Sequence, residues 1–182
     1  YMFNKSYPFD LEKYDSVIPY KELNQVDLAM TGFGYGKTQA TPLHMAMVAS
    51  TIANNGIMMQ PKLVKSITDK EERNIYKAKD EKLSIVTSKT NANNIRDMMV
   101  DVVNEGTGKA AYISGIQVAG KTGTTDKSNG SLDAWFVGFA PAYDPQIAVA
   151  IVVEDAADTG GVTVAPIARN LLVDIFNQVN LD

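Results

Sequence analysis

Three stretches of the chain carry apolar residues at helical spacing. They cover residues 41–53, 88–105 and 164–178. The first begins at Thr41-Pro42, where threonine can cap free amides and proline fits the first helical turn. It is almost wholly apolar, so we expect it to be buried against a sheet. Gly106 is the expected C-cap of the second helix. In the third helix we expect one apolar stripe, formed by Ile167, Leu171, Leu172, Ile175 and Phe176.

Strand patterns concentrate in the second half of the chain. Apolar and polar or small residues alternate over 116–119, which predicts that Lys121 lies on or just past a strand. Residues 134–139 and 147–154 form two further predicted strands, and the short connections favour an antiparallel meander. The run from 147 to 153 lacks alternation, so we expect that strand to be covered on both faces. We interpret Trp135 as a core residue.

The rest of the first half is less regular. Residues 1–30 form a loop-rich lead-in with short helical turns, 57–67 read as extended chain, and 69–82 as a charged, solvated hairpin or loop. His44 is the only histidine, which excludes histidine triads and multi-histidine metal sites, and we expect it to be a structural, hydrogen-bonded residue. The predicted fold class is α+β, an antiparallel sheet flanked by helices.

Composition narrows the partners and the compartment only slightly. A net charge of -4 leaves no basic footprint, so nucleic acid is not an expected partner, and the absence of cysteine excludes thiolate metal sites. No metal or cofactor is expected. The longest aliphatic run has seven residues, far short of the roughly 20 needed to cross a bilayer. The start at Tyr1 is neither initiator-like nor signal-like, which suggests a piece of a longer protein.

The candidate chemistry is concentrated at Lys121-Thr122-Gly123-Thr124. Gly120 and Gly123 remove side chains around the lysine, so a ligand or another backbone can approach the strand closely. The Lys121 ammonium and the threonine hydroxyls can hold a carboxylate or a phosphate, because both anions need several donors at short range.

Residues 115–122 also match the phosphate-loop pattern G-x-x-x-x-G-K-[ST]. That loop needs a flexible arc between its glycines and a helix directly after the lysine. Here the intervening residues read as strand, and turn-forming residues follow. A phosphate-binding NTPase is therefore a disfavoured alternative, which Mg-ATP titration would test.

The same residues resemble the K-T-G triad of penicillin-binding proteins and serine β-lactamases. The flanking residues 118–120 and 133–141 look like the surroundings of that triad in high-molecular-weight, class B-like penicillin-binding proteins. Three further segments resemble the same family: 41–46 (T-P-L-Q-x-A, with His44 in place of glutamine), 106–111 (G-T-G-x-A-A) and 160–166 (G-G-x-x-A-A-P). The resemblance covers nearly the whole chain from Met30 onward.

Two motifs of that family are missing. No serine has a lysine three residues later, and no S-x-N is present. The family places both motifs before the T-P-L helix, so the resemblance implies that residues 1–182 are the C-terminal part of one transpeptidase domain. Its DD-peptidase/β-lactamase-like sheet would then be incomplete, and its last strand would expose an apolar edge.

The resemblance implies serine acyl transfer between peptidoglycan stem peptides that end in D-Ala-D-Ala, with β-lactams as mimics of the donor. The implied catalytic residues are Lys121 and Thr124, and the implied substrate-binding residues are Lys121, Thr122, Gly123 and Thr124. Lys121 would provide positive potential and assist proton transfer, and both threonines would bind the substrate carboxylate. The backbone N–H of Thr124 would serve the oxyanion hole, and Gly123 would leave room for the acyl group.

The nucleophile and its S-x-x-K and S-x-N motifs would come from the missing N-terminal half, so the chain alone is expected to be inactive. Family membership further implies a parent anchored in the bacterial cell membrane with this domain on its extracytoplasmic face. A β-lactam-sensing receptor domain is the main alternative, distinguished by its deacylation rate. A β-lactamase is disfavoured because no residue here supplies its hydrolytic base.

Overall fold

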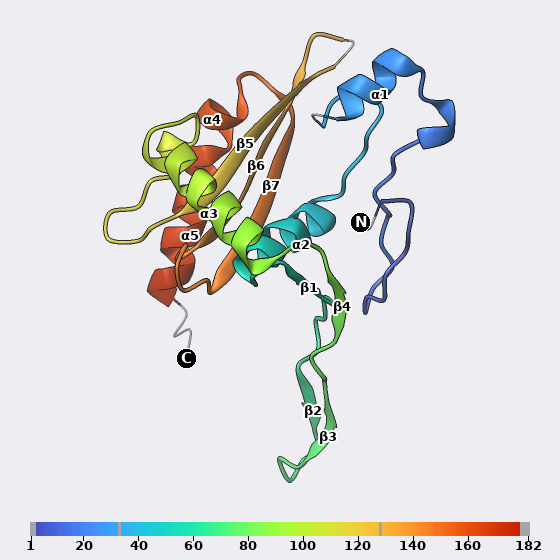
Figure 1. The fold of residues 1–182 in the computed structure, drawn as a ribbon. Helices are drawn as coiled ribbons and strands as arrows, with labels where there is room; N and C mark the ends of the chain where they lie inside the picture. Colours follow the sequence, from blue (N-terminus) through green and yellow to red (C-terminus); the bar gives the residue numbers. More distant parts are fainter. Residues whose placement is uncertain (1–2, 33, 128, 179–182) are drawn as a thin grey trace.

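The computed structural model describes residues 3–32, 34–127 and 129–178. Its centre is a three-stranded antiparallel sheet in the order β5-β6-β7 (Figure 1). The strands are β5 (Ala119–Asp126), β6 (Leu132–Ala140) and β7 (Ile147–Ala156). This is the predicted meander, although each of the last two strands is longer than the sequence pattern indicated.

Helices cover both faces of this sheet. They are α2 (Pro42–Ala53), α3 (Lys89–Asn104), the single turn α4 (Gly160–Thr163) and α5 (Ala165–Gln178). The three predicted helices are thus confirmed, and the Thr41 hydroxyl accepts a hydrogen bond from the His44 amide at 3.2 Å, as an N-cap should. The α+β class with an antiparallel sheet flanked by helices is confirmed.

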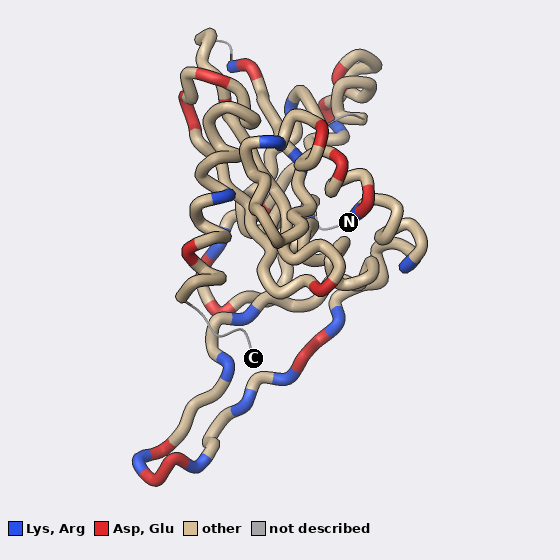
Figure 2. The backbone as a smooth tube through the Cα atoms, turned by 90° about the vertical axis from the view of Figure 1, so that its left-hand side faces the viewer, with Lys and Arg blue, Asp and Glu red and all other residues tan. Residues whose placement is uncertain are grey.

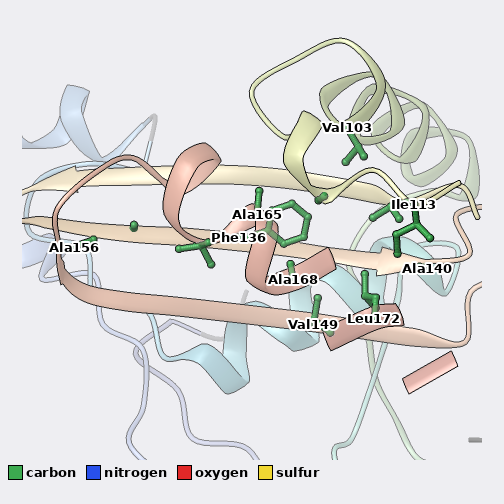
Figure 3. Packing of buried hydrophobic residues seen from close by; sticks show 13 residues of the cluster. Val103, Ile113, Phe136, Ala140, Val149, Ala156, Ala165, Ala168 and Leu172 are labelled. Atoms are coloured by element: carbon green, nitrogen blue, oxygen red, sulfur yellow. The ribbon is translucent and has the colours of Figure 1, made fainter. Parts of the chain in front are cut away.

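The central strand β6 contributes buried side chains to both faces of the sheet. Phe136 points into the larger core cluster, which includes Val103 of α3 and Leu172 of α5 (Figure 3). Phe139 points to the opposite face, into a second cluster that includes Ala49 of α2. Both phenylalanine side chains are fully buried. Because α3 contributes to both clusters, it lies along β5 and closes the core at that side.

One expectation about burial was wrong and a second holds only in part. Between residues 147 and 153 only Val149 is buried, because β7 is the outer strand of the sheet and the helices cover it incompletely. Of the predicted stripe on α5, Leu172 is fully buried and Phe176 packs against the core, but Ile167 and Leu171 are 44% and 40% exposed, and the other buried residues are Ala165 and Ala168. The small alanines let α5 approach the sheet closely, so its contact face is turned from the predicted stripe.

A long two-stranded arm leaves the body below α2 (Figure 1). Its base pairs β1 (Ile57–Met59) with β4 (Lys82–Ile85), and its outer part is a hairpin of β2 (Ser66–Thr68) and β3 (Asn74–Lys77). Every residue of β2 and β3 is exposed. The stretch 69–82, predicted as a charged, solvated hairpin or loop, forms the tip and the returning side of this arm, while β2 lies just before it. Figure 2 shows basic residues on both sides of the arm and acidic residues at its tip and along one side.

The first residues of the chain pack against α2 near the base of the arm, where Tyr7 forms a small core cluster with Met47 of α2 and Met58 of β1. The segment that follows leads away from the arm (Figure 1). It contains the short helical turn η1 (Tyr20–Glu22) and the helix α1 (Gln25–Thr31). His44 is 1% exposed, and its ring lies 4.8 Å from that of Phe3, measured between centroids. Its Nδ1 has no hydrogen-bond partner among the described residues. The expected structural role is therefore met by aromatic packing and not by a hydrogen bond at that nitrogen.

Candidate active site

The predicted site residues lie in the middle of β5, which pairs with β6 on one side only. Lys121 faces the same side of the sheet as its partner Val137, and Thr122 the same side as its partner Phe136. Side chains alternate along a strand, so Lys121 and Gly123 share one face and Thr122 and Thr124 the other. Among the described residues, no other strand pairs with β5 on its outer side.

The strand begins later than the sequence pattern predicted. Regular pairing starts at Ala119, and the preceding residues form a tight turn in which Ile113 and Ile116 pair across Gly115. Gly115 has a φ of +83°, a conformation that glycine adopts without strain. The alternation at 116–119 therefore did not mark a strand with one buried face, since the consecutive residues Val118 and Ala119 are both buried.

Glycines let the neighbouring rings approach β5. A Cβ at Gly120 would lie 2.4 Å from Cζ of Phe136 and 3.0 Å from Cγ2 of Val103, so that position has no room for a side chain. At Gly123 a Cβ would lie 3.2 Å from Cβ of Trp135. Trp135 is only half-buried and sits beside Gly123, which corrects its interpretation as a core residue.

The hydroxyls of Thr122 and Thr124 already form hydrogen bonds within the fold. Thr122 is 8% exposed, and its Oγ1 lies 2.7 Å from Oγ1 of Thr107 in the loop after α3. Thr124 is exposed, and its Oγ1 accepts a hydrogen bond of 3.1 Å from the amide of Gly160 at the start of α4. Lys121 is exposed, and its ammonium donates to the carbonyl of Thr122.

Sequence reasoning did not identify Thr107 and Gly160 as neighbours of the K-T-G residues. The G-T-G and G-G segments resembled family motifs, but nothing in their spacing indicated contact with β5. A Cβ at Gly160 would lie 2.4 Å from the carbonyl oxygen of Trp135 and 2.5 Å from that of Gly123. Only glycine permits this close approach. The one available signal in the sequence was therefore Gly160 itself, because a glycine can mark a place where another backbone comes close.

Polar contacts fix the far end of β5. The Lys127 ammonium pairs with carboxylates of Asp133 at 2.8 Å and Asp155 at 3.1 Å, and the hydrogen bond to Asp133 is the main reason that its pKa is raised. The Tyr35 hydroxyl donates to Oδ2 of Asp126 at 3.0 Å, which raises the pKa of that tyrosine. The hairpin end is thereby tied both to β7 and to the segment before α2.

The geometry does not match a phosphate loop. β5 continues without interruption from Ala119 to Asp126, and a hairpin to β6 follows where a helix would be required. Within the described ranges no three acidic or histidine side chains gather into a possible metal site. Nor is any helix there long and apolar enough to cross a membrane. The donors around β5 remain an ammonium, hydroxyls and open backbone.

A family model described as the penicillin-binding protein transpeptidase domain matches residues 3–173. The chain belongs to this family. The expected resemblance is thus confirmed, and with it the DD-transpeptidase fold.

The chain is 41% identical over 150 residues to the peptidoglycan D,D-transpeptidase PbpA of Mycolicibacterium smegmatis, which covers 78% of this chain and 30% of that protein. Among solved structures, the D,D-transpeptidase domain of a peptidoglycan glycosyltransferase from Eggerthella lenta matches with a TM-score of 0.86 and 40% identity over 97% of this chain and 46% of that one. Penicillin-binding protein A from M. tuberculosis, solved as an imipenem acyl-enzyme complex, matches with a TM-score of 0.81 and 34% identity over 91% of this chain and 37% of that one. This transpeptidase-family chain therefore spans less than half of each of these relatives.

Proposed function

We propose that this chain is the K-T-G part of a peptidoglycan D,D-transpeptidase domain that acts by serine acyl transfer and is acylated by β-lactams. The observation that carries the proposal is the placement of Lys121, Thr122, Gly123 and Thr124 on an edge strand whose outer side has no neighbouring strand among the described residues. The relatives named peptidoglycan D,D-transpeptidase support it, as does the acyl-enzyme state of the M. tuberculosis protein.

In the proposed reaction a serine outside this chain attacks the carbonyl carbon of the penultimate D-Ala of a stem peptide. The peptide bond breaks, and the terminal D-Ala leaves with the proton that the serine gave up. An amine from a neighbouring stem peptide then attacks the ester, its proton returns to the serine oxygen, and the new peptide bond cross-links the strands. A β-lactam follows the first step only, and its opened ring stays attached.

Each residue of the K-T-G strand has a proposed role. The Lys121 ammonium supplies positive potential beside the substrate's carboxylate and assists proton transfer, and Thr122 and Thr124 donate hydrogen bonds to that carboxylate. The backbone N–H of Thr124 is one oxyanion-hole donor, a contribution of typically about 3–4 kcal/mol to the barrier. Gly123 keeps the space beside Trp135 free for the acyl group.

The nucleophile, within S-x-x-K, and the S-x-N motif are proposed to come from a segment that precedes this one and completes the sheet at β7. That strand is the other edge of the sheet, and Ile151, Val152 and Val153 on it are only half-buried. An open apolar edge favours pairing with another strand. The complete domain is proposed to lie on the extracytoplasmic face of the bacterial membrane, where peptidoglycan is assembled.

The deciding experiment measures intact mass after incubation with benzylpenicillin. It compares this chain with an extended polypeptide, defined as the same chain continued upstream through the proposed serine. We expect only the extended polypeptide to gain one antibiotic mass. Labelling of the short chain would place the nucleophile within residues 1–182, and no labelling of either would contradict the proposed acylation.

A further inference from the structure

We propose that Thr107 is a positioning residue that turns the Thr122 hydroxyl into a hydrogen-bond donor for the ligand carboxylate, and that the Gly160 amide does the same for Thr124. This inference rests on the proposed function, because it concerns how that site recognises the carboxylate of its substrate. It assigns a role to two segments outside the K-T-G strand, the loop after α3 and the start of α4.

The direction of the hydrogen bond at Thr124 follows from chemistry. A backbone N–H can only donate, so the Gly160 amide occupies a lone pair of Thr124 Oγ1 over 3.1 Å. The hydroxyl proton of Thr124 is then available for another acceptor. An anion accepts hydrogen bonds and donates none, so it fits the remaining capacity of this hydroxyl.

At Thr122 the partner is a second hydroxyl, so the direction of the bond depends on the ligand. The two Oγ1 atoms lie 2.7 Å apart, and either can donate. A carboxylate beside Thr122 takes that residue's proton, which leaves Thr107 as the donor to Thr122. The resulting chain of donors polarises in one direction, which strengthens the bond to the anion. Thr122 is 8% exposed, so a ligand reaches its hydroxyl from a restricted side.

The loop that carries Thr107 is held in place before any ligand arrives. The amides of Gly106 and Gly108 donate to the carbonyl of Val102 at 3.1 Å and 2.9 Å, which fastens the loop to the end of α3. On the other side, a Cβ at Gly161 would lie 2.4 Å from the carbonyl oxygen of Thr107. The Thr107 hydroxyl is thus fixed between α3 and α4, and little reorganisation accompanies binding.

The test uses the extended polypeptide and two antibiotics that differ only in the carboxylate. Acylation by benzylpenicillin and by its methyl ester is followed at several concentrations, which separates the half-saturation concentration from the limiting rate. For Thr107→Val we expect the half-saturation concentration for benzylpenicillin to rise about threefold to tenfold, the effect of one neutral hydrogen bond. The limiting rate should change less than about twofold, and the methyl ester should react as with the unchanged protein.

Two variants separate positioning from stability. Thr107→Ser keeps the hydroxyl and should restore benzylpenicillin recognition. Thr51→Val is the matched control, because it removes a buried hydroxyl that donates to the Met47 carbonyl at 2.7 Å within α2, and it should leave both acylation parameters unchanged.

Three results would overturn the inference: an unchanged half-saturation concentration in Thr107→Val, an equal loss with the methyl ester, or failure of Thr107→Ser to restore binding. If the unchanged extended polypeptide is not acylated at all, the proposed function fails instead. If Thr107→Val does not fold, Thr107→Ala and Thr107→Ser are compared by the same two readouts, and equal recognition by both contradicts the role of the hydroxyl.

Discussion

The β5–β7 sheet and the β2–β3 arm are built by the same rule and differ in what surrounds them. Both are antiparallel with consecutive strands joined by short turns. In the sheet, Phe136 and Phe139 bury opposite faces of β6, whereas every residue of β2 and β3 is exposed. The arm also leaves Ile67, Ile75 and Tyr76 between 48% and 70% exposed. Backbone pairing alone therefore does not distinguish a structural sheet from a surface hairpin.

The difference matters for the proposed chemistry. A two-stranded hairpin is marginally stable by itself, while β5 rests on a strand that is packed on both sides. Groups that must meet a ligand within a few tenths of an ångström need such a support. We expect substitutions in the sheet to affect stability or acylation strongly and substitutions in the arm to affect neither.

The largest effect is expected at Phe136. Phe136→Ala leaves a cavity between β6, α3 and α5, which should lower the free energy of unfolding by about 3–5 kcal/mol. Urea unfolding of the extended polypeptide measures this. Ile75→Ala, at a position 70% exposed in the arm, is the control and should change stability by less than about 0.5 kcal/mol. Equal losses for the two variants would remove the distinction between sheet and arm.

Substitutions at two glycines of the sheet should affect the free energy of unfolding and the acylation rate differently. A Cβ at Gly138 would lie 2.5 Å from the carbonyl oxygen of Ala119, so Gly138→Ala should lower the free energy of unfolding by about 1–3 kcal/mol. A Cβ at Gly123 meets only Trp135 at 3.2 Å, so Gly123→Ala should cost less than Gly138→Ala. It should nevertheless slow benzylpenicillin acylation, because the added methyl enters the space proposed for the acyl group. If Gly123→Ala is acylated as fast as the unchanged protein, the proposed role of Gly123 is contradicted.

A third effect depends on pH. Burial is the main cause of the lowered pKa of His44, and nearby Lys13 adds to it. The unfolded chain therefore binds a proton more readily, so stability is complete above the unfolded pKa of about 6.5 and is lost as pH falls below it. The loss is at most about 1.4 kcal/mol per pH unit. Urea unfolding between pH 5 and pH 8 should show this slope, and His44→Gln should reduce it; an unchanged slope would assign it to other groups.

The smallest effect is expected in the arm itself. Replacement of residues 66–77 by two glycines should change the free energy of unfolding by less than about 0.5 kcal/mol, because these residues bury no side chain. It should leave benzylpenicillin acylation unchanged. A larger loss in either measurement would show that the arm supports the body, and the comparison between the two regions would then fail.

The sequence predicted the fold where local signals and packing agreed. Thr41-Pro42 marked the start of α2, Ser88 caps α3, and the meander followed from three strand patterns with short links. The sequence failed where burial depends on the whole fold. Trp135 is hydrophobic yet half-buried, since it lies beside Gly123 on the less covered face of the sheet.

The candidate site was predicted only in part, because local sequence signals do not show contacts between distant segments. Its residues were identified because they are contiguous, and their roles remain proposals. Their supports were missed because the contacts join distant segments: Thr107 lies 15 residues from Thr122, and Gly160 lies 36 residues from Thr124. Tyr35 and Asp126, 91 residues apart, gave no pattern in the sequence at all.

The open outer side of β5 has a consequence for drug resistance under the proposed function. The amide and carbonyl groups that an edge strand turns outward recur at every second residue, a repeat of about 7 Å, and no exchange of one amino acid for another removes them, except that proline lacks the amide N–H. The antibiotic and the stem peptide would form hydrogen bonds with the same backbone groups. A variant that rejects the antibiotic and still binds the stem peptide would therefore have to differ in side chains or in the path of the whole strand. The close contacts at Gly120, Gly138 and Gly160 leave that strand little room to move.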